Sequence, residues 1–209
     1  VLKTLNGVVD VLVLNHAWIS ARDWVEHLDD GKHNEYVRQM METNFISYVN
    51  VVSSLLNYME STSGRVLVSS SGAGKGPVHK MAAYSASKHA IHGFFGSLRQ
   101  DLMWHKSNVT ITEAVIGRIS TENADNALSG QYEHIWMTDA ASTARALILG
   151  TLNRNPVIAY PRFQINSLLA FFNLMPRTYD ALMLLSANSD PCTNVPYEFL
   201  SLFSCAGKI

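Results

Sequence analysis

A nearly continuous apolar run from Val8 to Leu14 (VVDVLVL) constrains the fold of this chain more than any other feature. Strands with one face in water alternate apolar and polar residues, whereas strands buried on both faces have valine-rich runs of this kind. Parallel sheets bury both faces of their strands under helices. The run therefore predicts a strand of a parallel sheet that is covered by helices on both sides.

Segments with the patterns of strands and helices alternate along the rest of the chain. Strands are expected at Val66–Val68, Val109–Ile116 and Val157–Tyr160, long helices at Tyr36–Met59, Met81–Met103, Thr138–Leu152 and Phe163–Met175, and shorter helical pieces at Ala124–Leu128 and Tyr179–Leu185. Apolar residues recur along the long helices at spacings of three and four, and Thr138 is expected to cap its helix. The alternation predicts an α/β fold with a doubly wound parallel sheet and right-handed crossovers.

The length and charge of the chain limit its organisation and its partners. With 209 residues, of which 47% are hydrophobic, it can form one sizeable core but not two. We expect one domain over residues 1–185 and a loose tail over residues 186–209, where Ser, Asn, Asp, Pro and Thr are frequent. The formal net charge of −1 indicates no basic surface, so we expect no nucleic-acid partner.

No metal site is expected from the spacing of potential ligands. Cys192 and Cys205 form no C-x-x-C pair, and their positions are compatible with one disulfide or with two free thiols. His92 follows Lys88 by four residues, but no carboxylate or third ligand is spaced near it. We therefore expect His92 to have a packing role rather than to bind a metal.

The stretch from Val66 to Phe95 carries the residues best suited to chemistry. It contains Tyr84 and Lys88, which share one face of the expected helix because they lie four residues apart, and Ser71, which ends the preceding strand. The carboxyl ends of parallel strands meet at one edge of a sheet, where ligands bind. A hydroxyl, a phenol and an ammonium at this edge could move a proton to or from a carbonyl or alcohol oxygen. A Tyr-x-x-x-Lys pair alone has low specificity and is also compatible with a surface pair at the start of a helix.

Each of these groups suggests a role. A free phenol has a pKa of about 10, and a nearby ammonium favours its ionised form, so we expect Lys88 to lower the pKa of Tyr84. Tyr84 would then act as the acid when a carbonyl is reduced and as the base when an alcohol is oxidised. Ser71 would hydrogen-bond the reacting oxygen, and Lys88 would also hold a ribose hydroxyl. Asn44 interrupts the apolar pattern of the Tyr36–Met59 helix and could bind a water through which Lys88 relays protons.

These motifs together resemble the classical short-chain dehydrogenase/reductase family, which has a Rossmann-like fold. The matching segments over Val8–Pro161 are NHA, METNF, VSSS, YSASK and GRIST, and the segments LNH, NFISYV, GFFGSLR and NVTIT are most similar to its 11β-hydroxysteroid dehydrogenase-like subgroup. The resemblance implies that Asn44, Ser71, Tyr84 and Lys88 are the catalytic residues. It also implies cofactor-binding positions at Asn15, Tyr84, Lys88, Ile119 and Thr121.

The resemblance further implies a function and a setting. We expect an oxidoreductase that transfers a hydride between NADP(H), rather than NAD, and a small hydrophobic, steroid-like alcohol or ketone. A homodimer is expected. The sequon Asn108-Val109-Thr110 is compatible with glycosylation, and with it we expect the endoplasmic reticulum lumen or the secretory pathway. The apolar segment Phe163–Met175 could line a substrate pocket, pack on a partner subunit or contact a membrane surface.

One part of the family pattern has no match in this sequence. The glycine-rich T-G-x-x-x-G-x-G turn and its amino-terminal βαβ units are missing, and the glycines Gly72, Gly74 and Gly76 follow the serine strand instead. That turn binds the pyrophosphate of the cofactor. We therefore expect that the chain is a fragment truncated at its amino end, and that its first strand has one unpaired edge.

Two alternative functions remain open. The chain could be a catalytically silent fragment that cannot bind cofactor. It could also resemble the sugar-nucleotide epimerases of the extended family, which share Y-x-x-x-K. The segments NVTIT and VIG argue against the epimerases.

Overall fold

The computed structural model describes residues 7–28, 31–122, 124 and 137–187. The two cysteines and the tail from residue 188 lie outside these residues, as does all but the first residue of the helix expected at Ala124–Leu128.

The described part of the chain is built on a four-stranded sheet in which all neighbouring strands are parallel. The strands β1 (Val11–Leu14), β2 (Arg65–Ser71), β3 (Thr110–Ile116) and β6 (Val157–Tyr160) lie in the order β1-β2-β3-β6. A second, smaller parallel pair joins β4 (Ile119–Ser120) to β5 (Thr138–Asp139). The prediction of a parallel α/β sheet is confirmed.

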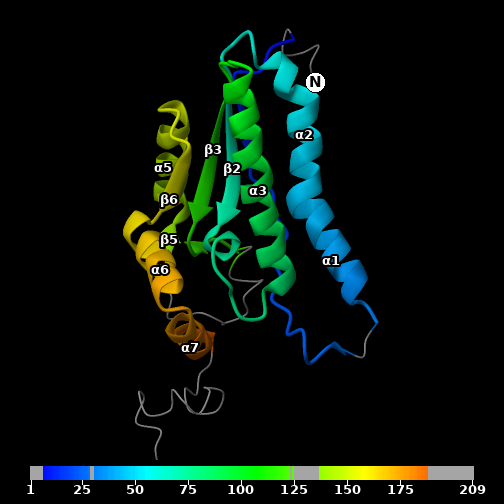
Figure 1. The fold of residues 1–209 in the computed structure, drawn as a ribbon, viewed down its shortest axis with the longest axis vertical. Coiled ribbons are helices and arrows are strands. Elements are labelled where there is room, and N and C mark those ends of the chain that lie inside the picture. Colours follow the sequence, from blue (N-terminus) through cyan, green and yellow to red (C-terminus); the bar gives the residue numbers. More distant parts are fainter. Residues whose placement is uncertain (1–6, 29–30, 123, 125–136, 188–209) are drawn as a thin grey trace, which may run out of the picture.

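Helices cover both faces of this sheet (Figure 1). The helices are α1 (His33–Met41), α2 (Ser47–Leu55), α3 (Ala82–Trp104), α5 (Ala140–Leu152), α6 (Arg162–Leu174) and α7 (Pro176–Ala187). Val66 and Val68 of β2 pack in a core with Tyr48 of α2 and Phe95 of α3. Leu67, between the two valines, faces the other way and packs with Leu147 of α5, as alternation along a strand requires. Each of the two faces of β2 therefore has its own hydrophobic core.

The helix expected over Tyr36–Met59 is present but changes its geometry twice. A π-helical step, η2 (Glu42–Ile46), separates α1 from α2, and a 3-10 turn, η3 (Leu56–Tyr58), ends the run. Asn44 lies inside the π-helical step and is fully buried. Such steps occur most often at functional sites.

The first strand is less buried than its sequence predicted. β1 pairs only with β2 among the described strands, and its residues Val11 and Val13 are 44% and 52% exposed. Among the described strands, β1 therefore has one unpaired edge, as expected. The prediction that this strand is buried on both faces was wrong, because no described element covers the side chains of Val11 and Val13.

Helix boundaries differ from expectation by a few residues, and two of these differences have a physical cause in the residues at the helix start. The cap of α5 is Asp139, whose carboxylate accepts a hydrogen bond of 2.8 Å from the Ser142 amide, whereas Thr138 belongs to β5. Pro176 follows the end of α6, as expected, but it also begins α7, which is longer than the expected piece at Tyr179–Leu185. Proline is favoured at a first helical position because that residue needs no amide hydrogen bond.

Candidate active site

A cavity of about 410 Å³ opens where the carboxyl ends of the central strands meet. Among the residues that line it are Asn15 after β1, Ser71 at the end of β2, Tyr84 and Lys88 of α3, and Ile119 of β4. Thr121 also lines it, so this one cavity brings together six of the seven residues that the sequence singled out. The seventh, Asn44, is not among the lining residues.

Tyr84 and Ser71 form the polar centre of the cavity. Tyr84 lies in the first turn of α3 and is 7% exposed, and a hydrogen bond joins it to the Ser71 side chain. Burial raises the pKa of Tyr84 to about 12, against the lowering effect of the Ser71 hydrogen bond. The phenol is therefore protonated at neutral pH.

Lys88 lies one turn further along α3 and is 2% exposed. Its ammonium donates a hydrogen bond of 3.1 Å to the Ser69 carbonyl, and its Nζ lies 5.7 Å from the ring centroids of both Tyr84 and Tyr48. Burial lowers the pKa of Lys88 to about 8. The expectation of a lowered Tyr84 pKa was wrong, because burial of the phenol is the dominant effect and raises it, while the Lys88 ammonium hydrogen-bonds the Ser69 carbonyl.

Asn44 fixes the wall behind the cavity. Its side-chain amide accepts a hydrogen bond of 2.7 Å from the Trp18 amide and donates to the Trp18 carbonyl at 2.9 Å and to the Ser87 hydroxyl at 3.1 Å. Ser87 in turn donates to the Tyr84 carbonyl at 2.7 Å. Asn44 thus joins the loop after β1 to the first turns of α3, and its role in a water relay stays a prediction.

Asn15 lies beside the central strand, where the resemblance placed it. Its side-chain oxygen accepts a hydrogen bond of 2.7 Å from Ser69 on β2, across the parallel β1–β2 pair. This contact holds the loop after β1 against the strand that carries Ser71.

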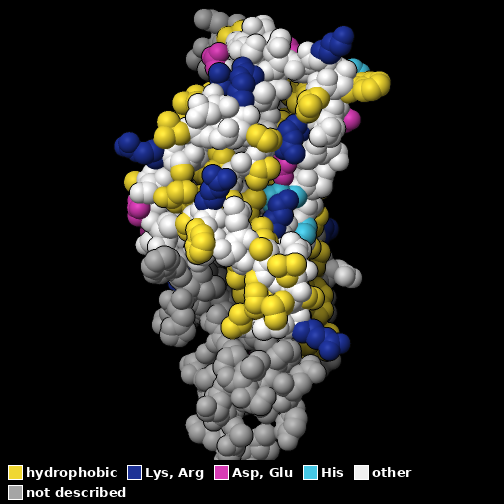
Figure 2. All heavy atoms as spheres, turned by 60° about the vertical axis from the view of Figure 1, so that its left-hand side comes forward, with side chains coloured by type: hydrophobic (Ala, Val, Ile, Leu, Met, Phe, Trp, Pro, Cys, Tyr) yellow, Lys and Arg dark blue, Asp and Glu magenta, His cyan; other side chains and the backbone are white. Residues whose placement is uncertain are grey.

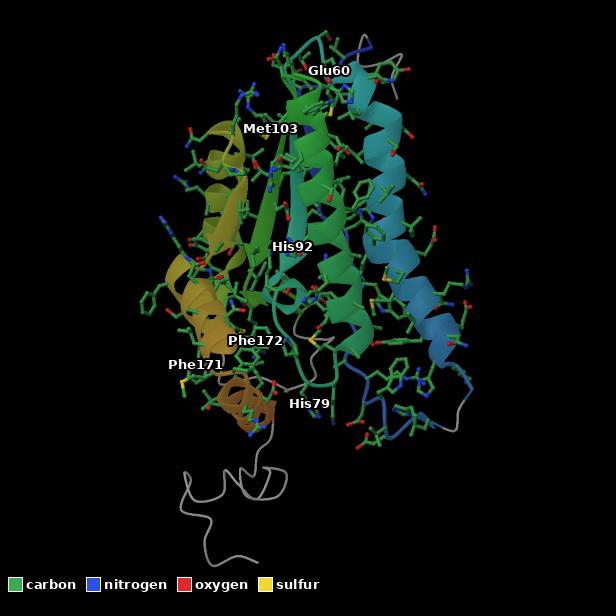
Figure 3. All side chains as sticks on the ribbon, viewed as in Figure 1. Glu60, His79, His92, Met103, Phe171 and Phe172 are labelled. Atoms are coloured by element: carbon green, nitrogen blue, oxygen red, sulfur yellow. The ribbon has the colours of Figure 1, made fainter. Side chains whose placement is uncertain are left out.

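The far wall of the cavity is apolar and comes from α6 and α7. It is lined by Ile165 and Leu168 of α6 and by Met183 of α7. Lining a substrate pocket was one of the three roles considered for the Phe163–Met175 segment. Tyr179 of α7 also lines it; its ring packs edge-on against Phe172 at 4.9 Å, and its hydroxyl donates to the Pro77 carbonyl at 3.2 Å. Figure 3 shows Phe172 between α6 and the centre of the molecule. The contribution of α7 was not predicted, because its only signal in the sequence was a short apolar pattern.

The glycine-rich turn after Ser71 serves close packing. A Cβ at Gly74 would lie 2.8 Å from the Lys88 carbonyl oxygen, and a Cβ at Gly76 would lie 3.0 Å from the Tyr179 hydroxyl. The space beside these glycines is thus filled by protein, and the turn has no room there for a phosphate. This agrees with the view that the turn is not the family's pyrophosphate-binding motif.

A parallel α/β sheet with a serine, a tyrosine and a lysine around one cavity at its carboxyl edge defines a class of nucleotide-dependent oxidoreductases. The family model described as "short chain dehydrogenase" matches residues 1–131 of the chain. This chain belongs to the short-chain dehydrogenase family.

Curated relatives narrow the position within the family. The chain is 38% identical over 156 residues to the hydroxysteroid 11-beta-dehydrogenase 1-like protein of Gallus gallus, covering 74% of this chain and 52% of the relative. It is 33% identical over 177 residues to the protein of the same name from Xenopus tropicalis, covering 83% and 58%. The chain thus spans about half the length of these curated relatives.

A solved structure supports the fold. A short chain dehydrogenase from Burkholderia cenocepacia J2315, determined in complex with NADP, is similar with a TM-score of 0.70 at 18% identity, covering 87% of this chain and 71% of that one. Within the described residues, no helix is both long and apolar enough to cross a membrane.

Proposed function

We propose that this chain carries the proton-transferring part of an NADP(H)-dependent oxidoreductase that acts on a hydrophobic, steroid-like ketone or alcohol. One observation supports this most: a single cavity combines Ser71, Tyr84 and Lys88 with an apolar wall from α6 and α7. In this proposal the catalytic residues are Asn44, Ser71, Tyr84 and Lys88. Asn44 fixes the position of the α3 turn that carries Tyr84 and Lys88.

The protonation state of Tyr84 suits the role of the acid in ketone reduction. When bound, NADPH supplies the hydride that forms the new C–H bond at the carbonyl carbon. The Ser71 hydroxyl positions the carbonyl oxygen, and Tyr84, protonated at neutral pH, donates its proton to that oxygen as the alcohol forms. Lys88, with a pKa of about 8, is mostly charged at pH 7 and stabilises the phenolate that Tyr84 becomes.

The donor groups of the cavity fit the ribose and nicotinamide end of the cofactor. Among the described residues, the Lys88 ammonium has one hydrogen-bond partner, the Ser69 carbonyl, and Lys88 lines the cavity. Its remaining donors are suited to ribose hydroxyls. Ile119 and Thr121 line the same cavity and would contact the nicotinamide end, and Asn15, which also lines it, would steady the sheet beside the cofactor. NADP(H) is proposed over NAD from the subgroup resemblance.

We also propose that the protein is exposed to the endoplasmic reticulum lumen or the secretory pathway. Asn108 of the sequon is exposed, as glycosylation in the endoplasmic reticulum lumen or the secretory pathway would require. Figure 2 brings the α5 and α6 side forward and shows hydrophobic side chains on this surface. Phe163 and Leu174 of α6 are 86% and 80% exposed, which supports contact with a second copy in a homodimer or with a membrane surface.

The function is tested by NADPH oxidation with steroid and non-steroid hydrophobic ketones. The 209-residue chain is assayed alone. In a second arm it is assayed as a fusion in which a βαβ unit with the family's glycine-rich turn precedes it. Tyr84→Phe should lower turnover by roughly 10²- to 10⁴-fold. The matched control, Tyr36→Phe, removes a phenol that bonds the Ser20 carbonyl away from the cavity and should leave turnover unchanged.

The outcomes separate the alternatives. Turnover of the fusion alone would mean that the 209-residue chain is catalytically silent without the added unit. Absence of turnover in both arms, or full turnover of Tyr84→Phe, would refute the proposal.

A further inference from the structure

A buried set of charged and polar groups lies behind the proposed active site, where α3 crosses β2 and β3. Glu113, in the middle of β3, is 3% exposed. One of its oxygens lies 2.6 Å from Nδ1 of His92, and the other accepts a hydrogen bond of 2.8 Å from Arg99. Figure 3 shows His92 between α3 and the strands. Glu113 is 21 residues from His92 in the sequence, so residue spacing gave no sign of this contact.

The second ring nitrogen of His92 points to the strand that carries the proposed catalytic serine. Nε2 lies 2.9 Å from the Ser70 hydroxyl, which lies 3.4 Å from the Lys88 carbonyl oxygen. Ser70 stands between Ser69, whose carbonyl accepts the Lys88 ammonium, and Ser71, whose side chain contacts Tyr84. Movement of Ser70 would therefore change both of these contacts.

Glu113 determines which nitrogen of His92 carries the proton. An ionised carboxylate can only accept, so Nδ1 must donate to it. In the neutral ring Nε2 then has no proton and accepts the hydrogen bond from Ser70. When the ring is protonated, Nε2 donates to the Ser70 oxygen, and the Ser70 proton turns to its other described acceptor, the Lys88 carbonyl.

The groups around His92 favour the neutral ring at pH 7. Burial lowers the pKa of His92, and this effect outweighs the hydrogen bond to Glu113, which raises it. Lys75, from the turn after β2, and His89, from α3, lower the pKa further, while Arg99 is paired with the other oxygen of Glu113.

We propose that His92 is a positioning residue for the reaction assigned above. In its neutral form it accepts from Ser70 and so holds the Ser69–Ser71 end of β2 against the turn of α3 that carries Lys88. Protonation of His92 reverses this hydrogen bond and turns the Ser70 proton to the Lys88 carbonyl, which changes the arrangement. The inference rests on the proposed function for its effect on turnover, and on the hydrogen bonds alone for its effect on Lys88.

Two amide substitutions separate the two nitrogens of the ring. His92→Gln places its amide near the position of Nε2 and can still bond Ser70, whereas His92→Asn reaches only the position of Nδ1 and can bond only Glu113. Gln should keep at least half of the turnover and Asn should lose roughly tenfold, the effect of one lost positioning hydrogen bond. A role confined to neutralising Glu113 would reverse this order.

The second measurement needs no turnover. The Lys88 side chain is titrated by ¹³C NMR in the chain labelled at lysine Cε. Its pKa, about 8 in the unaltered chain, should fall in His92→Asn, because the ammonium loses a well-placed acceptor, and should stay in His92→Gln. Ser70→Ala, which changes little volume, should behave like His92→Asn and serves if the His92 variants do not fold.

The pH profile completes the test. The acid limb of kcat should follow the His92 ring titration seen by NMR, and this limb should be absent in His92→Gln. The proposal would be overturned if the Lys88 pKa were the same in all variants, or if His92→Asn had more turnover than His92→Gln. If the unaltered chain shows no turnover in either arm, the proposed function fails, while the Lys88 titration still decides the role of His92.

Discussion

Replacement of Lys88 by methionine should stabilise the protein, and the gain should depend on pH. Lys88 is 2% exposed, and the Ser69 carbonyl is its one hydrogen-bond partner among the described residues. Burial lowers its pKa from 10.5 to about 8. A buried cation without a counter-ion destabilises the folded state, and proteins tolerate this cost mainly at functional sites.

The magnitude follows from proton linkage. One unit of pKa corresponds to about 1.4 kcal/mol, so this shift corresponds to an unfolding free energy lowered by about 3 kcal/mol at pH 7. Between pH 8 and pH 10 the unfolded chain binds a proton at this lysine that the folded chain does not. Stability therefore rises with pH over this window, and the cost is full below pH 8.

The assay is urea unfolding of the unaltered chain and of Lys88→Met at pH 7.0, 8.5 and 9.5. Methionine has a similar length and no charge, so its variant should be more stable by about 2–3 kcal/mol at pH 7, and the difference should shrink at pH 9.5. Comparing the two proteins at each pH cancels other titrating groups, including Tyr84. Lys106→Met, at an exposed lysine, should change stability by less than about 0.5 kcal/mol at every pH.

A variant that is less stable than the unaltered chain at pH 7, or a difference that does not change with pH, would refute the reasoning. Either result would mean that the ammonium has better partners than the Ser69 carbonyl.

Three further predictions concern the same region. Gly74→Ala should lower the free energy of unfolding by about 1–3 kcal/mol, because its Cβ would lie 2.8 Å from the Lys88 carbonyl oxygen, a backbone atom that cannot move away. The control Gly93→Ala lies in open space on α3 and should raise the free energy of unfolding by about 0.5–1 kcal/mol in the same urea assay. Burial raises the pKa of Glu113, but the contacts with His92 and Arg99 outweigh it and hold that pKa below its ordinary value. The ionised carboxylate therefore stabilises the fold above about pH 4.5 and loses this effect as the pH falls further. Glu113→Gln should accordingly lower Tm at pH 7 and converge with the unaltered chain in acid; a constant gap would contradict this. Lys88→Ala in the fused protein should weaken NADPH binding, followed by cofactor fluorescence, and unchanged affinity would count against its ribose contact.

The local geometry of the site could be predicted because it depends on spacing. Tyr84 and Lys88 lie four apart on a helix, and Ser71 ends a parallel strand, so their meeting at one sheet edge follows from sequence periodicity. The same holds for the strand at Val157–Tyr160, whose bounds the structure reproduces.

The electrostatics of the site could not be predicted, because burial depends on the whole fold. The pKa of Tyr84 is set by burial, and no spacing in the sequence shows how deeply α3 is covered. The contact between His92 and Glu113 depends on how α3 lies across β3, and Glu113 looked like one residue of an ordinary strand. The wall from α7 was missed for the same reason, since Tyr179 reaches the cavity through tertiary packing.

The π-helical step at Glu42–Ile46 makes this stretch unusually sensitive to the loss of a residue. Deleting one residue here would let α1 and α2 join as a regular α-helix, which local energetics favour. The wider π-helical turn holds one more residue than an α-helical turn, so the deletion would leave α2 in the same register relative to α1. Tyr48 and Val52 would then stay in the core, whereas the amide of Asn44, which lies inside the step, would leave Trp18 and Ser87. The loss of one codon here would thus leave the helix and its core contacts in place and remove the hydrogen bonds by which Asn44 joins the loop after β1 to α3.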